Sequence, residues 1–300
     1  MGITLGIVGY GEVGAIFGRG LLHQEGIDAV WVWDLKFADA AGGPAARAAA
    51  EADGMRVATG MQDLCAAAGL TISAVTASNT LAVAEEAAPH ARAGTRFLDL
   101  NSASPGAKQQ AGAALEGVGV SYVEAGVMTS VPPYGIRVPM LLGGAQAEAL
   151  AATLCGWGMD AHAVSLQLGV ASAIKMSRSI MIKGLEALVI ESYTTARRYG
   201  VEAHVLPTLQ ETFPQIDWER QGAYFFSRVV QHGKRRAEEM REAARTVREA
   251  GFEPIMAAAI ADKQDWVARQ ARGGLFDGLD GQSPWQAYAD RLIAQEPSPS

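Results

Sequence analysis

Three glycines near the amino terminus have the spacing with which a main chain wraps around a phosphate. Gly9, Gly11 and Gly14 form the pattern G-x-G-x-x-G at the end of a short apolar run, Thr4–Gly9. The first glycine permits a tight turn, the second lets the main chain approach a pyrophosphate, and the third lets a helix pack on the strand. The pattern predicts a dinucleotide site with contacts from Gly9, Tyr10, Gly11, Glu12, Val13 and Gly14. The alternative is a glycine turn that binds no nucleotide.

An acidic residue stands where the second strand of such a unit would end. Asp34 closes the β-rich stretch Asp28–Asp34 and lies 20 residues after Gly14. A carboxylate at this point hydrogen-bonds the adenosine ribose and repels a 2′-phosphate, so it favours NAD over NADP. Lys36 follows two residues later and softens that preference, so NADP remains possible. The alternative for Asp34 is a solvated acid at the end of a strand.

Composition describes a folded chain with a sizeable core. Its 300 residues are 49% hydrophobic and 19% charged, with a net charge of −7. The length predicts two domains, and the negative charge argues against nucleic acid or an anionic membrane as the main partner. Cys65 and Cys155 form no CxxC pair, and no metal site is expected. The chain has no cationic leader and no apolar run of membrane-spanning length, so we expect a cytoplasmic protein.

The first half of the chain alternates strand-like and helix-like segments. The strands predicted after Thr4–Gly9 are Asp28–Asp34, Arg56–Ala58, Leu70–Thr76, Thr95–Leu100, Ser121–Gly126 and Pro139–Gly143. Such β-α-β alternation indicates a parallel sheet with right-handed crossovers. We therefore predict a doubly wound Rossmann domain over residues 1–163.

Strand signals stop after Val164, and helical periodicity takes over. The predicted helices are Ser172–Tyr199, Leu206–Thr212, Trp218–Gln231, Lys234–Ala250, Met256–Ala271 and Pro284–Ala294. The charged stretch His232–Arg236 between two of them is expected to be a solvated turn, although His232 or Lys234 could reach a substrate. The fold class is thus α/β plus all-α, with a helical domain over residues 164–300.

Four segments resemble the β-hydroxyacid dehydrogenase and 6-phosphogluconate dehydrogenase superfamily in their order and spacing. Gly6–Leu21 is similar to the family's nucleotide-binding turn, and Asp99–Lys108 to its segment near the nicotinamide. Tyr122–Gly144 is similar to its D-A-P-V-S-G-G substrate segment, and Gly169–Leu188 to its G-x-G-x-x-x-K-x-x-x-N helix. The resemblance covers nearly the whole chain. It implies a Rossmann domain followed by a helical substrate and dimerisation domain that begins with a long helix. It also implies an NAD(P)-dependent enzyme and a homodimer paired through the helical domain.

By this resemblance Lys175 is the catalytic lysine. Taking hydride from an alcohol requires a base for the hydroxyl proton, and the reverse reaction requires an acid at the same point. Burial on an apolar helix face lowers the pKa of an amine toward neutrality. The apolar surroundings are expected from Ala171, Ile174, Leu185 and Leu188. The alternative is a surface lysine whose stem lies beside the core.

The remaining predicted contacts include departures from the family pattern. Ser179 replaces the family's Asn one turn after the lysine and is predicted as a second catalytic residue. Met128-Thr129-Ser130 replaces S-G-G, and these main-chain amides, with Arg178, are predicted to hold a substrate carboxylate. Ser102 is expected beside substrate and nicotinamide, or as a helix cap. Further cofactor contacts are expected from Thr76, Ala77, Ser78 and Asn101.

The predicted function is hydride transfer between a small 3-hydroxy acid or related alcohol and NAD(P), in the cleft between the domains. Two alternatives stay open. One is an imine or ketone reductase on the same scaffold, although such enzymes usually lack the lysine. The other is a non-catalytic NAD(P)-binding sensor, which the altered Ser179 and Met128–Ser130 positions keep open.

Overall fold

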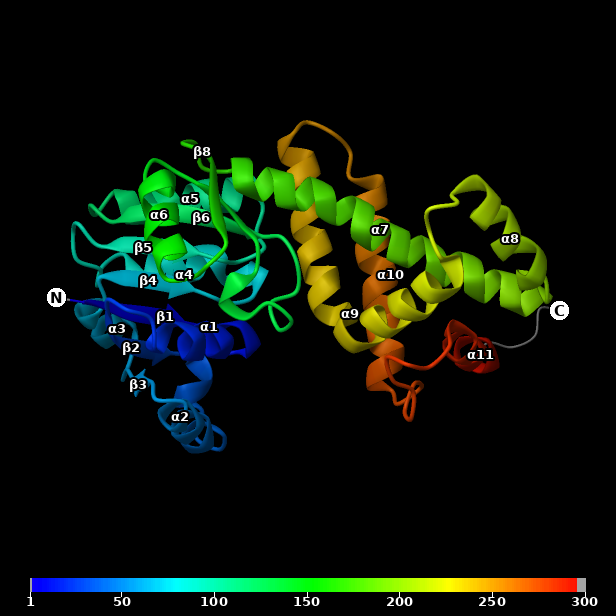
Figure 1. The fold of residues 1–300 in the computed structure, drawn as a ribbon, viewed down its shortest axis with the longest axis horizontal. Coiled ribbons are helices and arrows are strands. Elements are labelled where there is room, and N and C mark those ends of the chain that lie inside the picture. The colour runs from blue at the N-terminus through cyan, green and yellow to red at the C-terminus, as the bar shows by residue number, and fades with distance from the viewer. Residues whose placement is uncertain (1, 296–300) are drawn as a thin grey trace. The chain divides into compact units, whose positions relative to one another are not determined.

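The computed structural model describes residues 2–295. Its contacts divide the chain into two compact units, Met1–Met176 and Ser177–Ser300. Met1 and residues 296–300, at the two ends of the predicted domains, lie outside the described part. The boundary between the units falls within one long helix, α7 (Val170–Tyr199), which is labelled with the other elements in Figure 1.

The first unit is built on one eight-stranded sheet of order β3-β2-β1-β4-β5-β6-β7-β8. The strands are β1 (Ile3–Val8), β2 (Ile27–Trp33), β3 (Arg56–Val57), β4 (Leu70–Ser73), β5 (Arg96–Asp99), β6 (Ser121–Val127), β7 (Met140–Gly143) and β8 (Ala161–Ser165). β1 to β6 pair in parallel, β7 pairs antiparallel with β6, and β8 is parallel to β7. The predicted boundary after residue 163 falls inside β8, because this strand extends the sheet beyond β7.

Alternation along the strands produces a separate core on each face of the sheet. Leu98 and Val123 belong to one core, and their neighbours Phe97 and Tyr122 belong to the other. Helices α1 (Glu12–Leu22), α2 (Gly43–Ala52) and α6 (Ala147–Gly156) contribute to the first core. Helices α3 (Met61–Ala67), α4 (Thr80–Ala87) and α5 (Pro105–Glu116) contribute to the second. This three-layer arrangement confirms the predicted doubly wound class.

Three short 3₁₀ helices also belong to this unit, and two follow the ends of strands. They are η1 (Leu35–Ala38) after β2, η2 (Ala77–Asn79) after β4, and η3 (Gly135–Arg137) between β6 and β7. No strand occurs among residues 177–295, in agreement with the predicted all-helical second part.

The second unit holds most of α7 together with α8 (Glu202–Thr212), α9 (Trp218–Glu249), α10 (Ile255–Arg272) and α11 (Trp285–Gln295). Its core is rich in aromatic side chains; Tyr193 and Trp285 meet edge to face with ring centroids 4.8 Å apart. Tyr193 donates a hydrogen bond to the carbonyl of Trp218 at 3.0 Å, which satisfies its buried hydroxyl. Within residues 2–295 no helix is both long and apolar enough to span a bilayer.

The predicted break at His232–Arg236 is wrong, because α9 runs through it without interruption. A β-carbon on Gly233 would stand 2.8 Å from the carbonyl oxygen of Gln264 and 3.1 Å from the Cβ of Ala268 on α10. The glycine is therefore required by the close approach of two helices rather than by a turn. Arg236, expected in solvent, is buried against Glu186 of α7.

Candidate functional site

The predicted nucleotide contacts come together at one edge of the sheet. β2, β1, β4 and β5 are adjacent and parallel, so the residues that follow them lie at their common carboxyl end. These residues are Asp34, the glycine turn, the η2 segment with Thr76, Ala77 and Ser78, and the Asn101-Ser102 pair. Doubly wound sheets bind ligands at this edge, where the strand order reverses beside the first strand.

The glycine turn has the local geometry that its pattern predicts. Gly9 has φ of +89°, and a β-carbon there would meet the carbonyl oxygen of Ala74 at 2.5 Å. A β-carbon on Gly14 would stand 2.0 Å from the carbonyl oxygen of Gly9. Gly11 differs from both, because a β-carbon there would meet nothing within 4 Å. The first and third glycines thus close the turn, and the second leaves space above the start of α1.

Asp34 and Lys36 lie beside this turn. The Asp34 carboxylate accepts hydrogen bonds from the main-chain amides of Tyr10 at 2.7 Å and Lys36 at 2.9 Å. The Lys36 ammonium donates to the Tyr10 carbonyl and lies 3.8 Å from Asp34. Lys36 therefore partly compensates the charge of Asp34.

The side chain of Tyr10 points into the core, so only its main chain lies along the turn. Its ring is buried and its hydroxyl donates to Asp53 at 2.8 Å. Burial, with the hydrogen bond to Asp53, raises the pKa of the Tyr10 phenol well above its usual range. The phenol stays protonated and serves packing. Glu12 is exposed and Val13 is partly buried at the start of α1.

Asn101 connects two of the loops at this edge. Its side-chain oxygen accepts from the Val75 amide at 2.7 Å, and its side-chain nitrogen donates to Ser73 Oγ at 2.9 Å. The amide is buried and holds the segment after β4 in place. Thr76 and Ser78 are exposed, with their hydroxyl oxygens 3.3 Å apart. Asn101 thus positions the predicted cofactor-contact segment.

These residues fit a dinucleotide. The space above Gly11 admits a pyrophosphate, and Gly11, as the N-cap of α1, has no side chain to occupy the amides of the first turn. The residues that would hold the group are the glycine turn for the pyrophosphate, Asp34 for the ribose, and the segment after β4 for the nicotinamide half. Among residues 2–295, no group of three His, Cys, Asp or Glu side chains is placed to hold a metal ion.

Lys175 and Ser102, which are 73 residues apart in sequence, meet in the first unit. The Lys175 ammonium lies 2.5 Å from Ser102 Oγ, just beyond the end of β5. Lys175 is half-buried, and its stem lies beside β6: a β-carbon on Gly126 would stand 3.4 Å from the Cβ of Lys175. The predicted apolar surroundings are partly wrong, because Ile174 is 40% exposed and Leu188 is 56% exposed. Ala171 is buried as expected, and the close approach of Gly126 adds β6 to the surroundings of the lysine.

In Met128–Ser130, the predicted substrate segment after β6, one main-chain amide already donates a hydrogen bond within the protein. Met128 donates its main-chain amide to the Pro139 carbonyl at 2.9 Å, across the turn that leads to β7. Thr129 is exposed and Ser130 is half-buried. The prediction that the Met128 amide holds a carboxylate is therefore not supported by this geometry; Thr129 and Ser130 remain candidates.

Ser179 lies in the second unit beside a lysine that the sequence reading did not single out. Lys183, one turn further along α7, donates to Ser179 Oγ at 3.2 Å and pairs with Glu239 of α9 at 2.9 Å. Ser179 and Lys183 are buried, whereas Arg178 is exposed. Both serine and lysine thus belong to a polar network between α7 and α9.

Sequence reasoning also missed Glu124, which is fully buried in the middle of β6. Its Oε1 accepts from the amides of Gly169 at 2.7 Å and Ala171 at 3.1 Å, and its Oε2 accepts from the Ser172 hydroxyl. One signal could have revealed it: a lone acid inside the strand pattern YVEAGV must find donors when it is buried.

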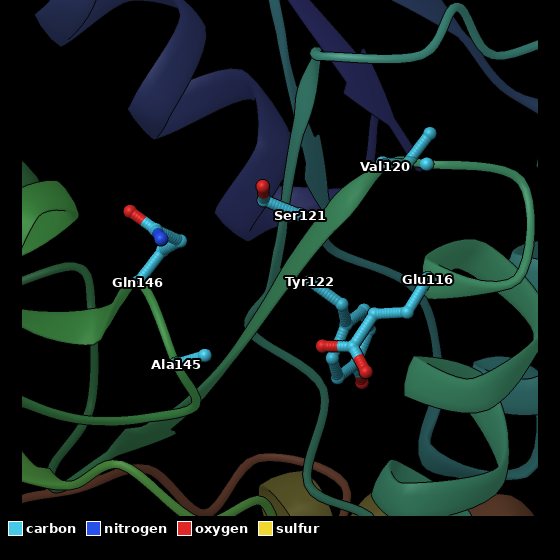
Figure 2. A pocket seen from close by; sticks show the side chains of 7 residues that line it. Glu116, Val120, Ser121, Tyr122, Ala145 and Gln146 are labelled. Carbon is cyan, nitrogen blue, oxygen red and sulfur yellow. The ribbon is translucent and has the colours of Figure 1, made fainter.

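A shallow depression elsewhere in the first unit carries little chemistry. It is lined by Glu116, Gly119, Val120, Ser121, Tyr122, Ala145 and Gln146 (Figure 2). Ser121 is the first residue of β6, so the depression lies at the opposite end of this strand from Gly126. Among the residues that line the depression, Glu116 has the one charged side chain. The carboxyl edge of the sheet therefore remains the candidate site.

Two sequence-family profiles match the chain. Residues 4–152 match the profile described as the NAD binding domain of 6-phosphogluconate dehydrogenase. Residues 196–267 match DUF1932, a domain of unknown function. The first match covers the glycine turn, Asp34 and the segments after β4 to β6.

Solved structures with the same fold include proteins of similar sequence. A conserved hypothetical protein from Sinorhizobium meliloti 1021 is 36% identical, with a TM-score of 0.78 over 99% of this chain and 97% of that one. A conserved protein of unknown function, described as structurally similar to 3-hydroxyacid dehydrogenases, is 28% identical, with a TM-score of 0.70 over 90% and 98%. The 3-hydroxyisobutyrate dehydrogenase of Mycobacterium tuberculosis, studied with L-serine, is 18% identical and shares the fold, with a TM-score of 0.73 over 97% and 99%.

Proposed function

We propose, from the premise that this chain belongs to the β-hydroxyacid dehydrogenase and 6-phosphogluconate dehydrogenase superfamily, that it oxidises or forms a 3-hydroxy acid with Lys175 as general acid and base. The family and the use of NAD(P), both predicted from sequence, are confirmed by the profile match. The chain is therefore an NAD(P)-dependent oxidoreductase of this superfamily. The substrate and the lysine mechanism are the proposal.

The observation that carries the proposal is the Lys175–Ser102 contact at the carboxyl edge of the sheet. A hydroxyl oxygen at hydrogen-bond distance from the amine is the arrangement that proton transfer to or from a substrate alcohol requires. Ser102 thus marks where a substrate hydroxyl binds. Bound nicotinamide supplies the hydride acceptor or donor. In oxidation, neutral Lys175 takes the hydroxyl proton as the carbon loses hydride; in reduction, the ammonium returns that proton to the carbonyl oxygen.

The substrate carboxylate is assigned to the segment after β6. Thr129 and Ser130 follow the strand that carries Gly126, beside which Lys175 lies. Main-chain amides and hydroxyls bind a carboxylate without needing a buried cation. The predicted roles of Arg178 and Ser179, and the predicted homodimer, remain part of this proposal.

A substrate panel with one matched pair of variants tests the proposal. Wild type is assayed for NADH and NADPH formation with aliphatic and aromatic 3-hydroxy acids, followed by K175A and by K263A, which removes a lysine of α10 that pairs with Glu191. K175A should lose about 10²–10⁴-fold in kcat, the usual contribution of a general acid or base, and should retain cofactor affinity; K263A should behave as wild type. Full turnover by K175A would remove the lysine from the chemistry. Cofactor binding without turnover of any substrate would favour the alternative of a non-catalytic NAD(P)-binding sensor.

A further inference from the structure

The buried carboxylate of Glu124 is placed to hold the first turn of α7 against the sheet. Gly169, Ala171 and Ser172 all direct donors at it, and together with Glu124 they form what we call the helix clamp. A helix N-terminus carries partial positive charge and unsatisfied amides, which a carboxylate neutralises. Because Glu124 is on β6, which pairs with β5 on one side and β7 on the other, the clamp ties the start of α7 to the interior of the sheet.

Two glycines make room for this contact. On β7, Gly143 pairs with Glu124, and a β-carbon there would stand 2.7 Å from Glu124 Oε1. On β6, a β-carbon on Gly126 would stand 3.0 Å from the carbonyl oxygen of Ala171. Glu124 and Gly126 are two residues apart and face the same side of the strand. One strand therefore both captures the helix end and sets how closely the helix approaches.

Lys175 lies three residues after Ser172, the last residue of the helix clamp. Ser172 and Lys175 are separated by less than one helical turn, so a shift of the first turn moves the lysine stem with it. The ammonium must reach the oxygen beside Ser102 from a stem seated on Gly126. We propose that Glu124 is a positioning residue for catalysis: through the clamp it sets the position of the Lys175 amine. This inference rests on the proposed role of Lys175.

Three variants test the clamp in the full-length protein. E124L removes all acceptors at similar size, E124Q retains one acceptor oxygen for the two amides, and V123A makes a cavity on the opposite face of the same strand. Misplacement of a catalytic group by about 1 Å can cost about 100-fold in rate. We expect a loss of about that size in kcat for E124L, recovery to within about tenfold of wild type for E124Q, and wild-type kcat for V123A. The KM for NAD(P)H should change by less than about twofold in all three, because ground-state cofactor binding is separate from the lysine's position.

Hydrogen exchange of the Gly169 and Ala171 amides provides a readout that needs no substrate. Protection should fall strongly in E124L, fall slightly in E124Q and stay unchanged in V123A. If E124L does not fold, G126A replaces it, because its new methyl group displaces the same turn while the carboxylate stays paired. Folded E124L or G126A with the kcat of V123A would overturn the inference. If wild type turns over no substrate, the proposed function fails, and unchanged amide protection in the Glu124 variants would separately overturn the clamp.

Discussion

Substitution of Gly11 by alanine should separate cofactor binding from folding. A β-carbon at this position meets nothing within 4 Å, and the residue has φ of −83° and ψ of −160°, an extended conformation open to any residue. Replacing glycine with alanine at a compatible position stabilises a protein by about 0.4–1 kcal/mol, because the unfolded chain loses freedom. The G11A protein should therefore unfold at a temperature equal to or slightly above that of wild type.

The same methyl group occupies the space through which a pyrophosphate would approach the first turn of α1. Loss of one charge-assisted hydrogen bond costs about 1.5–3 kcal/mol, which corresponds to about a 10- to 150-fold rise in Kd. Titration of the protein with NADH and NADPH, followed by fluorescence, measures this Kd, and thermal unfolding measures stability. G11A that binds both nucleotides as tightly as wild type would refute the placement of the pyrophosphate above Gly11.

G14A is the contrasting variant. Its β-carbon would stand 2.0 Å from the carbonyl oxygen of Gly9, so the turn or α1 must move. Such overpacking costs about 1–3 kcal/mol or more. G14A should lower the unfolding temperature as well as nucleotide affinity, whereas G11A lowers affinity alone. Equal stabilities of the two variants would contradict the different surroundings of the two glycines.

Three further outcomes are expected. D34A should raise the Kd for NAD about tenfold, because one hydrogen bond to the ribose is lost, and should change the Kd for NADP little. If direct titrations give the same ratio of the Kd values for NAD and NADP as in wild type, Asp34 does not bind the ribose. Iodoacetamide at pH 8 should alkylate exposed Cys155 and spare Cys65, since burial raises the pKa of the Cys65 thiol to about 11; mass spectrometry of the native protein would contradict this by finding Cys65 labelled first. R236M should destabilise the second unit by about 3–5 kcal/mol, because the buried Glu186 loses its ionic partner and keeps only the hydrogen bond from Gln264. The double variant R236M/E186L should recover most of that loss in urea unfolding, and a single variant as stable as the double would refute the explanation.

Local chemistry explains why much of the first unit could be predicted. The turn from Gly9 to Gly14 places its constraints within six residues, and the acid that ends β2 stands at a regular spacing from it. Apolar and β-rich runs predicted seven strands, β1 to β7, in their observed order, since burial on both faces leaves a continuous pattern. β8, with its alternating exposure, gave no such run.

The long helices were predicted in type but not always in extent. Helical periodicity identified α7 and α10 to within a few residues. The charged stretch His232–Arg236, which contains Gly233, was expected to be a turn but belongs to the continuous helix α9. A glycine has the same local signature in a turn and in a close helix crossing. Only the neighbour on α10 distinguishes the two.

The sequence by itself determined the residue types of the site: a phosphate-binding turn, a ribose acid and a lysine in a family-like helix. Tertiary structure alone decided their partners. It placed Lys175 on Ser102, paired Ser179 with Lys183, and directed three donors at Glu124. The physical reason is that local spacing encodes backbone conformation, while a side chain's hydrogen-bond partner depends on which distant segments the packed sheet and helices bring within about 3 Å of it.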